Sequence, residues 1–182
     1  MRQESAGRML RFRRWEQADV LPMYDIVLSN GMKKQGLTLI DAKSLKLFRE
    51  PKSEAEARAA CKSQCAMLHI SGYGVDEGMA KDIAKARGVL LFSFSDILRE
   101  SGFRRAIAIS KMRLALEACR GAGANFAACT LAANSNELRT KHELLAFLSV
   151  LGIGTHEKKH SECILERICG KSGAAALQKE SM

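Results

Sequence analysis

The feature of this sequence that most restricts its fold is an apolar strand flanked by two helices. Residues 89–94 read Val-Leu-Leu-Phe-Ser-Phe, and such nearly continuous apolar runs are typical of strands buried on both faces of a parallel sheet. A helix that Asp76 caps and Gly88 ends precedes the run, and a helix from about Ala106 to Arg120 follows it. The next apolar run, Phe126 to Leu131, predicts another strand. This order predicts an α/β fold with a parallel sheet, either a barrel or a doubly wound sheet.

The same alternation continues on both sides of this unit. We expect short strands at residues 9–13, 37–40, 45–48 and 66–70, and helices over residues 16–35, 53–63, 140–152 and 157–169. Pro22 must lie in the first turns of the 16–35 helix or interrupt it. Capping boxes at Ser53–Glu56 and Thr140–Glu143 mark two of the helix starts. A length of 182 residues suits one domain, which we place at residues 1–170, followed by a flexible C-terminal tail at residues 171–182.

Charge and cysteine usage indicate the class of partner and the compartment. With 29 Lys and Arg against 20 Asp and Glu, the net charge is +9, which favours a polyanionic partner, nucleic acid first. No apolar run approaches a membrane span, and we expect neither a signal peptide nor a membrane-surface helix. No Cys-x-x-Cys pair is present, so we expect reduced thiols that fill small core positions in a cytoplasmic protein. The six cysteines are Cys61, Cys65, Cys119, Cys129, Cys163 and Cys169.

Two short motifs suggest ligand chemistry, and each has a simpler structural interpretation. His156 and His160, with Glu157 between them, match the H-E-x-x-H zinc pattern, but the two lysines at 158 and 159 favour a solvated, charged helix start. The glycines at 72, 74 and 78 follow a predicted strand, but the third is one residue too late for a dinucleotide fingerprint, which leaves a flexible loop. His69 ends an apolar strand, and we interpret it as a core histidine with its hydrogen bonds satisfied.

A basic stretch from Arg99 to Arg120 carries more information. It holds six basic residues against two glutamates, a local excess of +4. Its first part, the Ser95–Arg105 loop with the adjacent Arg104 and Arg105, leaves the carboxyl end of the buried strand, where functional groups of parallel sheets gather. Arginine pairs suit phosphate because the guanidinium binds it bidentately. A solvated helix face with ordinary ion pairs explains the stretch equally well.

Around this stretch the sequence resembles a known family. Residues 94–106, Phe-Ser-Asp-Ile-Leu-Arg-Glu-Ser-Gly-Phe-Arg-Arg-Ala, are similar to the most characteristic segment of the thirty-kilodalton-type protein subunit of ribonuclease P, called component 3 in archaea. Ser110-Lys111-Met112-Arg113 continues the pattern, and residues 137–143 resemble the family's Asp-Leu-Arg-Ser-Pro-Arg-Asp segment. The resemblance is specific over residues 89–153, looser over 48–72 and faint before residue 40. Ala132-Ala133-Asn134 departs from the family's Ser-Gly turn.

The resemblance implies a TIM-like barrel, here shortened or incomplete because a strand and a glycine-rich loop after Gly72 are missing. It also implies a subunit with no catalytic residue, metal site or cofactor of its own. In that family the RNA subunit, with magnesium, removes the 5′ leader of precursor tRNA. The resemblance therefore implies as partners this RNA, precursor tRNA, a small α/β protein subunit and further ribonuclease P proteins. Arg11, Arg13 and Arg14 would be an added basic feature. The RNA-binding candidates are Arg104 and Arg105, with Lys111, Arg113, Arg139 and Lys141 as secondary ones.

Two alternatives stay open at this point. One is a metal-dependent hydrolase, on a TIM-like barrel or through the His156–His160 pair. The other is a general RNA-binding protein derived from the family, because a fold does not fix a function.

Overall fold

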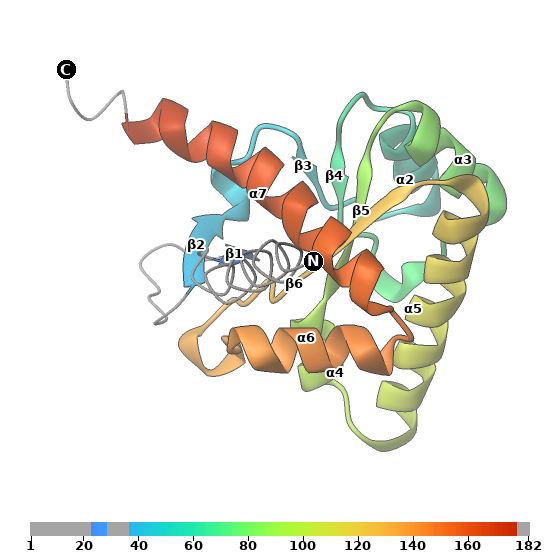
Figure 1. Cartoon of the computed structure of the whole chain (residues 1–182). Coiled ribbons are helices and arrows are strands. Elements are labelled where there is room, and N and C mark those ends of the chain that lie inside the picture. The colour runs from blue at the N-terminus through green and yellow to red at the C-terminus, as the bar shows by residue number, and fades with distance from the viewer. Residues whose placement is uncertain (1–22, 29–36, 178–182) are drawn as a thin grey trace, which may run out of the picture.

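Parallel strands and helices alternate along the computed structural model (Figure 1), which describes residues 23–28 and 37–177, with side chains at 25–28 and 38–167. The strands are β1 (Met23–Val27), β2 (Leu37–Asp41), β3 (Phe48–Arg49), β4 (Met67–Leu68), β5 (Val89–Ser93) and β6 (Asn125–Cys129). The helices are α2 (Glu54–Cys61), α3 (Glu77–Lys85), α4 (Phe94–Arg99), α5 (Gly102–Ala122), α6 (Lys141–Val150) and α7 (Thr155–Leu177). Short 3-10 turns are η2 (Ala42–Ser44), η3 (Ser71–Tyr73) and η4 (Ser135–Glu137). The strand predicted at residues 9–13 and the arginines at 11, 13 and 14 lie outside the described residues.

All strand pairs in the described residues are parallel, which confirms the predicted α/β class. One sheet has the order β3-β4-β5-β6, and the other pairs β1 with β2. The segment after β6 joins the two sheets: the Leu131 N–H donates to the Ile26 carbonyl at 2.9 Å, and the Leu28 N–H donates to the Ala132 carbonyl at 2.8 Å. Within the described ranges β2 and β3 do not pair, so no closed barrel is seen. The shortened or incomplete TIM-like barrel therefore stays a prediction beyond the parallel α/β fold.

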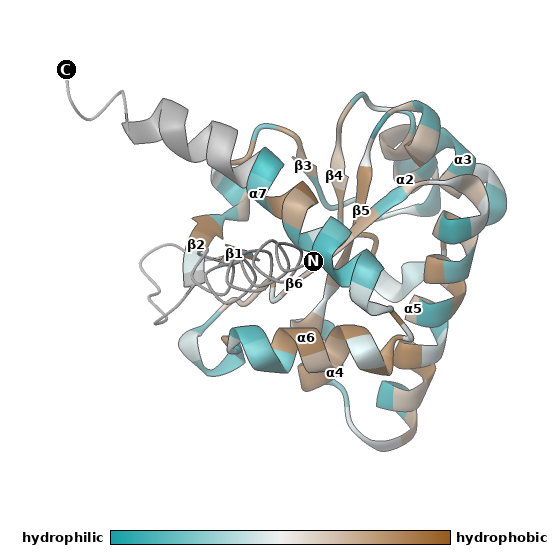
Figure 2. Ribbon diagram, viewed as in Figure 1, coloured by the Kyte–Doolittle hydropathy of each residue, from teal (hydrophilic) through white to brown (hydrophobic). Residues whose placement is uncertain are grey.

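The core lies on both faces of the four-stranded sheet. Leu90 and Phe92 of β5 pack in a cluster with apolar residues of α2, α3, α5 and α6. Val89 and Leu91 point the other way and pack in a second cluster that includes Ile164 of α7. Every residue of β5 is buried, as its apolar sequence predicts. The outer helices α3 and α5 carry both hydrophilic and hydrophobic residues (Figure 2), as expected of amphipathic helices that cover a sheet.

Local caps form where the sequence predicts them. The Ser53 hydroxyl accepts a hydrogen bond from the Glu56 N–H at 3.2 Å at the start of α2, and the Asp76 carboxylate accepts one from the Met79 N–H at 2.7 Å at the start of α3. Thr140 opens α6 with a complete capping box. Each of these contacts joins residues three positions apart, which is why the sequence alone reveals them.

Two predictions of secondary structure are wrong in the N-terminal part. The helix predicted over residues 16–35 contains a strand, β1, because Ile26 and Val27 become buried when β1 pairs with β2 and contacts the end of β6. Of the strand predicted over residues 45–48, only Phe48 is in a strand, the two-residue β3. Residues 46 and 47 form a turn instead, closed by the Phe48 N–H, which donates to the Leu45 carbonyl at 3.0 Å.

Two more differences concern the helices. The segment predicted as the Ser95–Arg105 loop contains α4, which Ser93 caps by accepting from the Asp96 N–H at 3.3 Å. The last helix is longer than the predicted 157–169 and runs to Leu177, into the segment expected to be a flexible tail. Among the described residues, no helix is long and apolar enough to span a bilayer.

Candidate nucleic-acid interface

The first turn of α5 gives the main candidate arginines a shared position. The strand β5 ends at Ser93, α4 follows directly, and α5 begins at Gly102, so Arg104 and Arg105 lie near the carboxyl end of β5. This corrects the loop placement, since both arginines are in a helix. The side chain of Ser101, the N-cap residue, makes no capping hydrogen bond, and the first turn holds no acidic residue. The two arginines therefore lie in the same turn as the positive end of the helix dipole.

Arg104 and Arg105 differ in how the protein holds them. In the described part of the chain, the exposed Arg104 guanidinium forms no hydrogen bond and no ion pair. The Nε of Arg105 donates to the Glu100 carbonyl at 2.8 Å, which fixes this side chain across the turn between α4 and α5. Arg104 is thus available for a ligand, and Arg105 is oriented with most of its donors unused.

Lys111 is a second candidate that, like Arg104, has no protein partner within the described ranges. It is exposed, and no hydrogen bond or ion pair engages it within the described ranges. Seven residues correspond to about 10 Å along a helix and to a turn of about 20° from a full rotation. Arg104 and Lys111 therefore lie on one side of α5 as two free cations.

The other three candidates have structural partners. Arg113 donates through Nε and Nη2 to the Val150 carbonyl, at 3.2 and 2.6 Å, and so satisfies the C-terminal end of α6. Arg139 donates to the carbonyls of residues 136 and 138, both at 2.8 Å, and lies over the Phe94 ring at 5.9 Å. The Nζ of Lys141 lies 4.0 Å from a Glu162 carboxylate oxygen.

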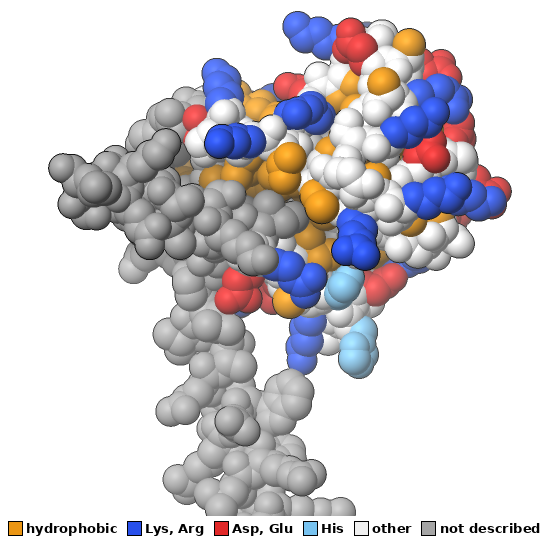
Figure 3. Space-filling model, turned by 90° about the horizontal axis from the view of Figure 1, so that it is seen from above, with side chains coloured by type: hydrophobic (Ala, Val, Ile, Leu, Met, Phe, Trp, Pro, Cys, Tyr) orange, Lys and Arg blue, Asp and Glu red, His pale blue; other side chains and the backbone are white. Residues whose placement is uncertain are grey.

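These residues do not form one compact patch. Lys141 begins α6, whereas Arg113 binds its last turn, about 14 Å further along by helix geometry. Figure 3 shows the same dispersion on one face, where Lys and Arg side chains form separate groups among acidic and hydrophobic ones. Of the six candidates, the two that have no protein partner in the described part of the chain are Arg104 and Lys111.

An ion pair that the sequence did not reveal fixes α4 against the segment after β6. Arg99 donates through Nε and Nη2 to the two carboxylate oxygens of Glu137, at 3.0 and 2.7 Å. Glu137 also accepts from the Ala133 N–H at 2.9 Å. The hydrogen bonds from Arg99 lower the pKa of Glu137 to about 2. The charge of Arg99, counted in the basic stretch, is therefore neutralised by a residue 38 positions away.

A buried polar network lies at the carboxyl ends of β3, β4 and β5. His69 contacts Glu50 through Nδ1 at 3.1 Å and Asp96 through Nε2 at 2.9 Å. The Tyr73 hydroxyl donates to the same Asp96 oxygen at 2.8 Å and accepts from the Ser93 N–H at 2.9 Å. His69 is 5% exposed, so the predicted core histidine with satisfied hydrogen bonds is confirmed. The network holds α4, and with it the start of α5, against the sheet.

Charge is stabilised inside this network. Burial disfavours the imidazolium, but hydrogen bonds and charge interactions with Asp96 and Glu50 outweigh it and raise the pKa of His69. Burial likewise opposes ionisation of Asp96, yet hydrogen bonds from His69, Tyr73 and Ser93 lower its pKa. Burial is the main cause that raises the pKa of the Tyr73 hydroxyl well above its ordinary value. The network thus favours an ionised Asp96 beside a protonated His69 and a neutral Tyr73.

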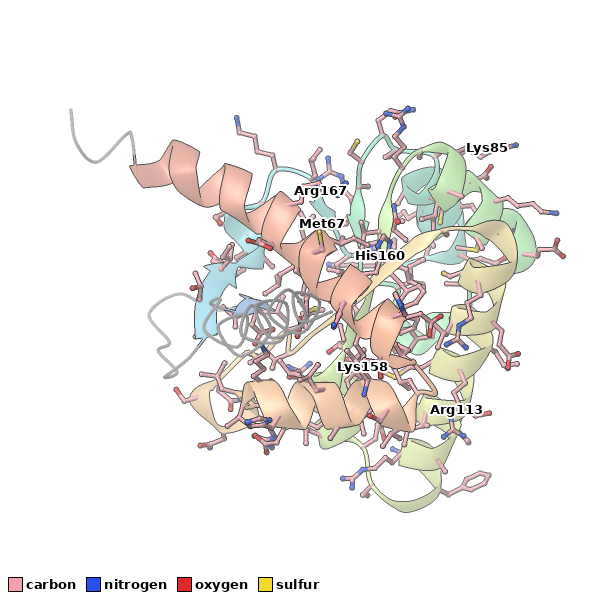
Figure 4. All side chains as sticks on the ribbon, in the orientation of Figure 1. Met67, Lys85, Arg113, Lys158, His160 and Arg167 are labelled. Carbon is pink, nitrogen blue, oxygen red and sulfur yellow. The ribbon has the colours of Figure 1, made fainter. Side chains whose placement is uncertain are left out.

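The zinc pattern on α7 serves a structural purpose. Glu157 accepts from Nε and Nη2 of Arg120, at 2.7 and 2.6 Å, and from the Gly154 N–H at 2.9 Å. His160 lies along α7 (Figure 4), with its Nε2 at 3.4 Å from the Asn125 side-chain oxygen. The described side chains hold no group of three or more His, Cys, Asp and Glu residues arranged for a metal ion.

The other motifs also have local structural uses. Gly72 adopts a φ of +74° inside η3, which agrees with a turn, whereas Gly74 and Gly78 have no positive φ. Cys61 and Cys119 are buried free thiols, and burial raises their pKa values to about 11 and about 12. Both thiols fill core positions, as the sequence predicts, whereas the prediction is wrong for Cys65 and Cys163, which are exposed.

Comparisons with known proteins show a likeness in fold to a solved structure. No family model matches the sequence, and no curated protein matches it. The structure is similar to a chain in the cryo-EM structure of archaeal ribonuclease P with mature tRNA, with a TM-score of 0.66 and 16% sequence identity. The alignment covers 88% of this chain and 86% of that chain. At this identity the likeness establishes a shared fold along nearly the whole length of both chains.

Proposed function

We propose that this chain is a protein subunit of a ribonuclease P ribonucleoprotein and corresponds to component 3 of the archaeal enzyme. The fold likeness, which extends over 88% of the chain, carries the proposal. A separate line of support is the sequence resemblance, because its most characteristic segment forms α4, the turn after it and the first turn of α5. A net charge of +9 agrees with an RNA partner.

In this proposal the chain does not itself cleave RNA. The RNA subunit, with its magnesium ions, hydrolyses the phosphodiester at the 5′ leader of precursor tRNA. The protein contributes by holding that RNA in place: Arg104 and Lys111 contact phosphates, and Arg105 is pre-oriented by the Glu100 carbonyl. Contacts of this kind position RNA without reading its sequence. We further propose a small α/β protein subunit and other ribonuclease P proteins as partners, in the cytoplasm.

We expect fewer residues to contact phosphate than the sequence suggested. Arg113 and Arg139 donate to backbone carbonyls inside the fold, so their replacement acts first on stability. Arg104 has no such use in the described part of the chain. An RNA phosphate at the first turn of α5 would meet the free donors of Arg104, the remaining donors of Arg105 and the exposed N–H groups of the helix start.

Reconstitution tests the proposal. The ribonucleoprotein is assembled from its RNA and protein subunits, and cleavage of precursor tRNA at moderate magnesium is measured with and without this chain. We expect cleavage to fall on omission and to recover on addition. Equal cleavage in both assemblies would contradict the subunit role and would favour the general RNA-binding alternative, provided that the chain binds RNA alone.

A matched pair of double variants locates the contact. The Arg104→Ala/Arg105→Ala variant should weaken RNA association and make it less salt-dependent, with the slope of log affinity against log salt reduced by roughly 1 to 2. The control is Lys81→Ala/Lys85→Ala, which removes two cations from α3. Lys85 lies far from Arg113 and the lower end of α5 in Figure 4. An unchanged salt slope in the arginine variant would remove these residues from the interface.

A further inference from the structure

The outer side of α5 carries an apolar side chain that the fold does not use. Phe103, in the first turn, is 80% exposed, the most exposed of the large hydrophobic side chains in the described residues. The face of α5 that packs on the sheet is formed instead by Met112, Leu116 and Cys119, all buried. Phe103 lies about 180° around the helix from Met112 by its position in the sequence. Core packing therefore does not explain an aromatic residue at this position.

The neighbours of Phe103 are cationic. Arg104 follows it directly and is free of protein partners within the described ranges, and Arg105 comes next, held by the Glu100 carbonyl. The first turn has no acidic residue, and the Ser101 side chain makes no capping bond. A ligand that covers Phe103 is thus expected to combine a flat apolar face with negative charge.

We propose that Phe103 is a stacking platform for an unpaired RNA base whose flanking phosphate is bound by Arg104. Single-stranded nucleic acid has this combination, because each nucleotide joins an aromatic base to a phosphate. A paired helix does not offer it, since its bases are stacked on one another and their faces are covered. The inference rests on the proposed function and goes beyond it: it assigns to the start of α5 an unpaired nucleotide rather than a duplex backbone.

The alternative occupant of this surface is a protein. Ile107 and Leu114 are 39% and 62% exposed. Leu114 lies about 16 Å further along α5 and only about 20° away around the helix axis from Phe103. A protein partner would use this apolar line along its length. A base at Phe103 would need the aromatic ring and would leave Leu114 uncovered, and the free Arg104 beside Phe103 favours the base.

The two occupants make opposite predictions for three variants. Phe103→Leu keeps an apolar side chain but removes the ring, Phe103→Trp keeps a ring, and Leu114→Ala is the matched control on the same face. The probe is a short unstructured RNA oligonucleotide with a fluorescent label, and its binding to the full chain is measured by anisotropy. We expect Phe103→Leu to weaken binding by roughly 5- to 150-fold, and Phe103→Trp and Leu114→Ala to leave it within about twofold. A perfectly paired RNA duplex should be bound equally by all four proteins.

Tryptophan fluorescence reports the stacking directly. The sequence holds one tryptophan, so Trp15→Phe with Phe103→Trp places a single fluorophore at the platform. Quenching by the oligonucleotide and little quenching by the duplex would support the proposal. Equal quenching by both RNAs would contradict it.

These experiments distinguish a failure of the stacking proposal from a failure of the proposed function. If the wild-type chain binds the oligonucleotide and Phe103→Leu binds equally well, stacking is overturned and the proposed function is untouched. If Leu114→Ala and Phe103→Ala release a protein subunit from the reconstituted particle while RNA binding is unchanged, the surface is a protein contact, which also overturns stacking. Both proposals fail if two results hold together. The wild-type chain alone binds no RNA, and particles with and without the chain bind RNA equally.

Discussion

The buried carboxyl group of Asp25 gives a sharp test of how β1 is packed. Its side chain is fully buried, and its two oxygens accept from the N–H and the hydroxyl of Thr130, at 2.7 and 2.6 Å. Burial raises the pKa of Asp25 from 3.8 to about 6, although both hydrogen bonds oppose the shift. The folded protein therefore holds this proton more tightly than the unfolded chain does. It follows that the stability contributed by Asp25 is largest below pH 3.8 and is lost as the pH rises to about 6.

The size of the effect follows from the shift. A difference of about two pH units, at about 1.36 kcal/mol each, corresponds to about 3 kcal/mol. The side-chain amide in the Asp25→Asn variant cannot ionise, so this variant loses no stability over the same range. We expect the free energy of unfolding of the variant, relative to that of the wild type, to rise by about 3 kcal/mol between about pH 3 and about pH 8. Urea unfolding followed by circular dichroism at several pH values measures this difference.

An exposed carboxylate provides the control. Glu117 is exposed on α5, so Glu117→Gln controls for the loss of a carboxylate that is not buried. A flat difference for Asp25→Asn across the same pH range would refute the reasoning. It would mean that the Asp25 carboxyl is not buried against Thr130.

Three further substitutions probe other parts of the fold. Glu137→Gln should lower the free energy of unfolding by about 1 kcal/mol, a modest loss because Arg99 is 43% exposed, and a wild-type urea midpoint would contradict the ion pair's role. Met112→Ala should cost about 2–5 kcal/mol in the same assay, because this side chain is fully buried; a loss below about 1 kcal/mol would show that α5 packs differently. Tyr73→Phe leaves a buried N–H and a carboxylate oxygen short of one partner each and should cost about 1–3 kcal/mol, whereas thermal unfolding unchanged from the wild type would exclude the network.

Local signals in the sequence predicted much of the fold. The caps at Ser53, Asp76 and Thr140 and the apolar run of β5 were recognisable because each depends on residues that are close in the chain. The helix predicted over residues 16–35 was wrong because strand formation there depends on pairing with β2 and on contacts with the end of β6. Propensity is a weak guide where distant contacts decide.

The sequence likewise predicted only the local features of the candidate site. The sequence identified the arginines that follow β5, because their type and their place after a buried strand are local features. It did not distinguish Arg104 from Arg113, since the partner of Arg113 is the Val150 carbonyl, 37 residues away. The Arg99–Glu137 ion pair was missed for the same reason, and it removes Arg99 from the set of free cations.

The sequence by itself determined the parallel α/β class, the ends of several helices and the surplus of positive charge, because periodicity, capping and composition are properties of neighbouring residues. Only the tertiary structure decided which charges are free. It joins Asp25 to Thr130 across 105 residues, encloses His69 between two carboxylates, and leaves Arg104 beside an exposed Phe103. The physical reason is that hydrogen bonds and burial act over a few ångströms in space, and the fold alone sets which residues lie within that distance.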